Sequence, residues 1–123
     1  VAQDMLAEEI NKYHFGLIPF FKKDTQISVE KMKYATSLKM FNYIEAGIPV
    51  IVSEELTYQS WLANRYDVGY AVKAVDINAL KSIVILKDYN VLVSNINKTR
   101  EYLSLKSNIS RLVDFYKKVA DSQ

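Results

Sequence analysis

Cysteine is absent from the 123 residues of the chain, and histidine occurs once. Without cysteine the chain forms no disulfide bond and offers no thiolate to a metal ion. One histidine also leaves too few side chains for a structural zinc site. The apolar runs fall short of the roughly 18 to 20 residues that a membrane-spanning helix needs. We therefore expect a fold held by its core alone, with no bound metal and no transmembrane segment.

Glycine is scarce as well, with three residues, and no Gly-rich phosphate motif of the P-loop or G-x-G-x-x-G type occurs. No Ser-His-Asp arrangement is present either, so kinase and hydrolase functions have no support. An excess of one charge is also lacking, because 16 basic and 14 acidic residues leave a net charge of +2. An excess this small does not indicate nucleic acid as a partner.

What remains is an ordinary globular composition, with 50% hydrophobic and 24% charged residues. The length fits one compact domain that spans residues 1–123. The first residues lack a signal-peptide core. We expect a cytoplasmic protein, either free or peripheral to the inner face of the membrane.

The stretch from Tyr34 to Ser53, YATSLKMFNYIEAGIPVIVS, organises the rest of the chain. Its pattern predicts a helix over Leu38–Ala46 that is capped at its start by a neighbouring hydroxyl. Gly47 ends this helix, because the residue after a helix often adopts the left-handed conformation. A continuous apolar run over Pro49–Ser53 is typical of a parallel strand covered on both faces. Helix, glycine and strand together indicate an α/β crossover.

The amino end of this helix is the candidate ligand site. Thr36 or Ser37 can supply the capping hydroxyl, and Lys39 shares a helix face with Asn42. A helix amino end combines unpaired N–H groups with a partial positive charge, so a lysine beside it makes it suited to phosphate. A solvated surface lysine and amide are the alternative interpretation.

The segment from Ser37 to Ser53 resembles the donor-binding domain of GT-B glycosyltransferases of the group 1, or family 4-like, type. Members of this group carry a pattern of the form K-x-x-E-Y-x-A-x-G-x-P-V-V. The matching residues are Lys39, Tyr43, Gly47, Pro49 and Val50. Outside this segment, Phe15–Phe20 is similar to the preceding strand of that domain, and Tyr66–Tyr70 to a later strand and turn.

The resemblance implies the C-terminal, nucleotide-sugar-binding part of an enzyme whose N-terminal domain precedes it. Such an enzyme transfers a sugar from a UDP- or GDP-type donor to an acceptor glycan, lipid or small molecule, without a metal ion or cofactor. It also implies diphosphate contacts at Ser37, Leu38 and Lys39. We assign no catalytic residue.

Two departures from the family pattern matter for the donor site. Asn42 replaces the glutamate that typically binds the donor ribose, and Tyr34 replaces the first glutamate of the E-x7-E pair. Asn42 still donates and accepts hydrogen bonds, so it is the candidate ribose contact, without a charge. Tyr34 and Thr36 are candidates for the donor loop. Because of these departures, a nucleotide-sugar-binding module without catalysis remains an alternative function. An α/β interaction domain without sugar chemistry is another alternative, because fold does not determine function.

The flanking patterns predict a Rossmann-like, three-layer α/β part-domain in which helices flank a small parallel sheet. Two further strands are expected at Phe15–Phe20 and Val68–Val72. Helices are expected at Ala2–Tyr13, at Tyr58–Asn64, after Asp76, at Asn90–Leu103 and at Asn108–Ala120. Thr57 is the expected cap of the second of these helices, and Trp61 is expected to pack toward the core.

Three other features are weaker candidates. Phe21–Lys33 reads as a polar, lysine-rich loop, either a surface excursion or a flap over the donor. Glu54 and Glu55 follow a buried strand, where α/β sites gather, although most such pairs are only solvated. His14, the single histidine, stands at a strand start and is more typical of a structural residue than of a general base.

Overall fold

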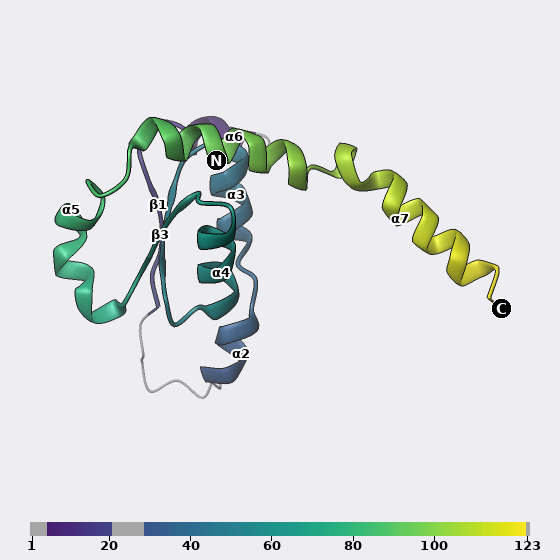
Figure 1. The fold of residues 1–123 in the computed structure, drawn as a ribbon, viewed down its shortest axis with the longest axis horizontal. Helices are drawn as coiled ribbons and strands as arrows, with labels where there is room; N and C mark the ends of the chain where they lie inside the picture. Colours follow the sequence, from purple (N-terminus) through teal and green to yellow (C-terminus); the bar gives the residue numbers. More distant parts are fainter. Residues whose placement is uncertain (1–4, 21–28, 123) are drawn as a thin grey trace.

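The computed structural model describes residues 5–20 and 29–122, which form a small α/β unit with one long helix projecting from it (Figure 1). The strands are β1 (Gly16–Ile18), β2 (Val50–Ser53) and β3 (Gly69–Val72). The helices are α1 (Leu6–Ile10), α2 (Val29–Tyr34), α3 (Leu38–Ala46), α4 (Thr57–Arg65), the 3-10 helix η2 (Ala74–Ala79), α5 (Leu80–Ile83), α6 (Tyr89–Leu103) and α7 (Leu105–Ala120).

The three strands form one parallel sheet in the order β1-β2-β3. Gly16 pairs with Val50, which in turn pairs with Gly69, so the three strands start in register. Helices cover both faces, with α3 and α4 on one side and α5 on the other (Figure 1). The predicted α/β class, with a parallel sheet flanked by helices in the Rossmann-like manner, is confirmed.

The α3 helix has the predicted bounds because local signals agree at both ends. Ser37, rather than Thr36, is the cap, and its Oγ accepts a hydrogen bond from the Lys39 N–H at 3.2 Å. Gly47 adopts the left-handed conformation, with φ of 79°, and its N–H donates to the Ile44 carbonyl at 3.1 Å. The chain therefore turns directly from α3 into β2.

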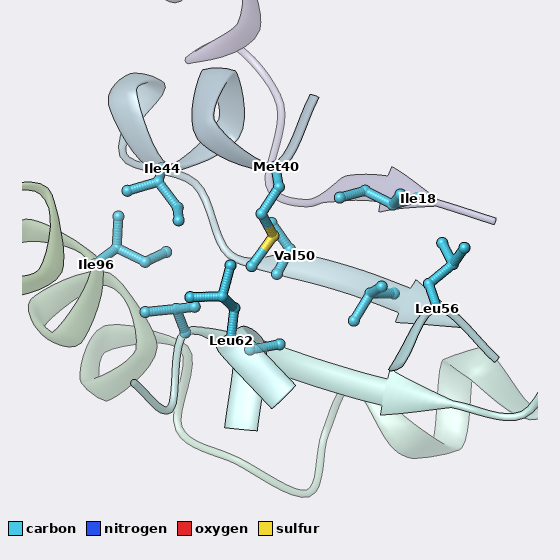
Figure 2. Packing of buried hydrophobic residues seen from close by; sticks show 10 residues of the cluster. Ile18, Met40, Ile44, Val50, Leu56, Leu62 and Ile96 are labelled. Atoms are coloured by element: carbon cyan, nitrogen blue, oxygen red, sulfur yellow. The ribbon is translucent and has the colours of Figure 1, made fainter. Parts of the chain in front are cut away.

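Two buried clusters lie on opposite faces of the sheet. Met40, Ile44, Val50 and Leu62 belong to the larger cluster, which fills the space between the sheet and helices α3 and α4 (Figure 2). The smaller cluster has these buried members: Ile51, Tyr70, Val72 and Leu92. The α6 helix contributes Leu92 to the smaller cluster and Ile96 to the larger one, so it packs against both clusters.

Close packing at one glycine fixes the distance between α3 and β1. A Cβ atom built on Gly16 would lie 2.2 Å from the ring of Tyr43, well inside van der Waals contact. The Tyr43 hydroxyl donates to the Leu17 carbonyl at 3.4 Å. The tyrosine ring therefore lies directly on the backbone of β1, and only glycine leaves room for it.

Four sequence-based expectations about helix positions need correction. The helix expected over Ala2–Tyr13 ends earlier than expected, because α1 stops at Ile10. Residues 1–4 lie outside the described residues. The expected loop Phe21–Lys33 ends in a helix, α2, which packs on α4. The first residues expected of the helix after Asp76 form a 3-10 helix instead, because the Asp76 N–H donates to the Lys73 carbonyl at 2.9 Å in a tight turn. The last helix starts at Leu105 rather than Asn108, because Ser104 caps it there.

Two expectations about α4 are also wrong. Thr57 is its first residue rather than its cap, and Leu56 in the cap position makes no side-chain cap hydrogen bond. Trp61 is 52% exposed and stacks on Tyr58, with ring centroids 5.8 Å apart. Leu62 and Ala63 take the buried positions instead, because they face the sheet.

The long helix α7 buries none of its residues and extends away from the sheet (Figure 1). A serine cap stabilises its first turn, since the Ser104 Oγ accepts a hydrogen bond from the Ser107 N–H at 3.1 Å. Among the described residues, no helix is both long and apolar enough to cross a membrane.

Candidate functional site

The candidate site lies where the parallel strands end, the edge at which open α/β sheets bind ligands. A cavity of about 420 Å³ opens there, beside the amino end of α3. Its walls come from the end of β1, the segment before α3, the first turn of α3 and the start of α4. The lining residues are Ile18, Pro19, Ala35, Thr36, Ser37, Lys39, Leu56 and Gln59. We call this space the α3 cavity; its volume is within the range that small-molecule ligands occupy.

The first turn of α3 presents the α3 cavity with groups that suit an anion. Ser37 uses its Oγ for the Lys39 N–H and its carbonyl for the Met40 N–H, at 3.2 Å and 3.1 Å. Within the described residues, the N–H groups of Ser37 and Leu38 make no hydrogen bond. Unpaired N–H groups, the helix dipole and the Lys39 ammonium together favour negative charge at this point.

The structure brings three of the six residues named from the sequence to this cavity: Thr36, Ser37 and Lys39. Leu38 sits in the same turn, but it is 80% exposed and is not among the residues that line the cavity. Asn42 is half-buried one turn further along α3, and Tyr34 is 75% exposed at the end of α2. Neither of these two side chains forms part of the cavity wall.

Gln59 is a wall residue that sequence reasoning missed. It lies on α4, is only 2% exposed, and donates from Nε2 to the Ala35 carbonyl at 3.2 Å. A signal for its burial does exist in the sequence, since Leu56, Gln59 and Leu62 share one helix face at three-residue spacing. A polar residue on an otherwise apolar face indicates either a buried contact or a binding site.

The weaker candidates lie elsewhere. His14 precedes β1 and therefore lies at the amino edge of the sheet, 5.8 Å from the ring of Tyr89. Glu54 follows β2 as expected but is exposed, and its N–H donates to the Val72 carbonyl at 3.0 Å. Glu55 is half-buried and does not line the α3 cavity. Of the lysines in the expected loop, Lys31 and Lys33 are exposed on α2, and the others lie outside the described residues.

A second polar cluster, at the amino edge, has a structural role. Lys87 Nζ lies 2.5 Å from Asp67 Oδ1 and 3.0 Å from the Gly69 carbonyl. Asn95 Nδ2 donates to the carbonyl and carboxylate oxygens of Asp67, at 3.1 Å and 3.2 Å. These groups satisfy one another, so the cluster ties α6 to the turn before β3.

The fold and its strand-end cavity define a Rossmann-like α/β part-domain. The model of the family described as "Glucosyltransferase 3-like, C-terminal domain" matches residues 1–114. The chain therefore belongs to this family, which relates it to the glycosyltransferases. No curated protein and no solved structure matches the chain.

Proposed function

We propose that this chain is the donor-binding part of a GT-B glycosyltransferase of the group 1 type, and that the α3 cavity holds a UDP- or GDP-type sugar. The observation that carries the proposal is that Ser37 and Lys39 line one cavity at the carboxyl edge of a parallel sheet. Membership of the glucosyltransferase 3-like family supports the same chemistry.

The diphosphate of the donor lies at the amino end of α3 in this proposal. The N–H groups of Ser37 and Leu38 donate to its oxygens, and the Lys39 ammonium contributes a full positive charge. As the bond to the sugar breaks, negative charge develops on the leaving diphosphate, and these fixed groups stabilise it. The leaving group then needs no metal ion.

The ribose of the donor contacts Asn42 in this proposal, and Thr36 and Tyr34 belong to the loop around the donor. Asn42 lies three residues after Lys39 and so on the same face of α3. Its amide can both donate to and accept from a ribose hydroxyl, although more weakly than a carboxylate.

Further parts of the protein complete the site in this proposal. Within the described sheet, β1 pairs only with β2, and Leu17 is 43% exposed at that open edge. Additional strands and an N-terminal domain would supply the acceptor site and the catalytic groups. The acceptor is a glycan, a lipid or a small molecule, and the reaction takes place in the cytoplasm or at its membrane face.

Replacement of Lys39 by alanine in the intact protein tests the proposal. We expect UDP or GDP affinity to fall roughly 10- to 100-fold, about what the loss of a charge-assisted contact costs. Titration calorimetry measures the change. Lys98→Ala is the matched control, because Lys98 is exposed on α6, away from the cavity, and should leave the affinity unchanged. Equal affinities for Lys39→Ala and the wild type would refute the diphosphate site.

A binding module without catalysis is the second candidate, favoured by Asn42 in place of the family's glutamate. Assays of sugar transfer by the intact protein and by its Asn42→Glu variant distinguish the two. Efficient turnover by the wild type eliminates the second candidate. Donor binding without turnover, with activity gained in Asn42→Glu, establishes it.

A further inference from the structure

Gln59 is the one strongly buried polar side chain in the wall of the α3 cavity among the described residues. It comes from the start of α4 (Thr57–Arg65). Apolar neighbours such as Ile18, Pro19 and Leu56 form much of the remaining wall. A polar group placed among them needs a hydrogen-bond partner.

Only half of the Gln59 amide has such a partner. Its Nε2 donates to the Ala35 carbonyl at 3.2 Å, which identifies the nitrogen end of the amide because a carbonyl accepts only from the nitrogen. The other atom, Oε1, is buried and has no hydrogen-bond partner within the described residues. A buried acceptor left in this state carries a desolvation cost that its surroundings do not offset.

A ligand in the α3 cavity can supply the missing donor. The terminal torsion of glutamine is broad, so the amide can turn toward the cavity at low cost. The bond to Ala35 is long, and Ala35 is exposed, so water replaces the Nε2 donor if the turn breaks it. Oε1 loses nothing in the turn, because it starts without a partner.

We propose that Gln59 Oε1 accepts a hydrogen bond from a hydroxyl or N–H group of the ligand whose anionic part lies at the amino end of α3. This inference rests on the proposed function and makes it more specific. An amide oxygen offers nothing to a phosphate oxygen, since both are acceptors. The α3 cavity therefore selects a phosphorylated polyol, such as a nucleotide sugar, over an inorganic anion of the same charge.

Replacement of Gln59 by leucine in the intact protein tests this inference. The probes are UDP-glucose, GDP-mannose and inorganic pyrophosphate, each titrated by calorimetry. We expect the nucleotide sugar that the wild type binds to lose roughly 3- to 10-fold in affinity, the effect of one neutral hydrogen bond. Pyrophosphate affinity should stay within about twofold, because its contacts are with α3.

Asn64→Leu is the matched control, since Asn64 is exposed on the same helix and should leave all three affinities unchanged. Thermal unfolding shows whether Gln59→Leu is folded, and Gln59→Met replaces it in the titrations if it is not. An unchanged nucleotide-sugar affinity, or an equal loss for pyrophosphate, would overturn the role of Gln59 and leave the proposed function standing. A wild type that binds pyrophosphate alone, or none of the three probes, would overturn both.

Discussion

Helices α3 and α7 are both amphipathic, yet only α3 has a buried face. In nine residues α3 buries Met40, Ile44 and Ala46, whereas α7 buries none of its 16. Apolar side chains also repeat at helical spacing along α7, but they remain between 42% and 69% exposed: Leu105, Ile109, Leu112, Val113 and Tyr116. A helical apolar pattern thus predicts that a helix forms, while a packed neighbour decides whether its face is buried.

The largest expected difference between the two helices concerns their apolar faces. Met40→Ala removes a fully buried side chain, so we expect a loss of about 2 to 5 kcal/mol in the free energy of unfolding. Leu112→Ala removes one that is 44% exposed and should cost less than about 1 kcal/mol. Urea unfolding of the intact protein measures both. Similar losses for the two variants would mean that the apolar face of α7 is covered in solution.

The carboxyl ends of the two helices provide a second, smaller contrast. Gly47 follows α3 with φ of 79°, so Gly47→Ala should cost about 1 to 2 kcal/mol from backbone strain. Its added Cβ meets nothing closer than 3.9 Å, so a steric clash contributes nothing. Gly47→Asn should lose less, because asparagine tolerates the left-handed conformation.

Asp121 follows α7 in the right-handed helical conformation, with φ of −73°. Asp121→Ala is therefore the control for Gly47→Ala and should leave stability nearly unchanged. Urea unfolding again measures the difference. A loss for Asp121→Ala as large as that for Gly47→Ala would contradict a cause in backbone strain.

The smallest expected contrast lies in the two serine caps. Ser37→Ala and Ser104→Ala each remove one cap hydrogen bond, for which about 1 kcal/mol is typical. Because α3 is part of the core, Ser37→Ala should lower the unfolding midpoint of the whole protein. Ser104→Ala should instead speed amide hydrogen exchange in the first turn of α7, with little change in the midpoint. If Ser104→Ala lowered the unfolding midpoint and Ser37→Ala did not, the expected difference between the two caps would be wrong.

The sequence predicted the region around α3 best because its local and tertiary preferences agree. Ser37, Gly47 and Pro49 mark the cap, the end of the helix and the start of the strand, and the structure places each boundary where they indicate. This agreement also identified the cavity-lining residues Ser37 and Lys39. The roles proposed for them, and for Asn42 and Tyr34, remain predictions.

The errors arose where tertiary contacts outweigh local preference. The α2 helix has a polar sequence without firm periodicity, and it packs against α4, which the sequence alone does not reveal. Trp61 is exposed because Leu62 and Ala63 already fill the space under α4. Gln59 shares an apolar helix face, but the partner of its amide, the Ala35 carbonyl, lies 24 residues earlier in the chain, where the sequence pattern does not reveal it.

The contact between Gly16 and Tyr43 has a consequence for how the site can change. Tyr43, in the second turn of α3, lays its ring on β1, and Lys39 stands in the first turn of the same short helix. A displacement of the Tyr43 ring would therefore move Lys39 with it. A larger side chain at position 16 would push the ring outward, tilt α3 and displace the ammonium. If the proposed donor site is right, substitutions beneath the helix therefore change donor affinity without altering any of the residues proposed to contact the donor.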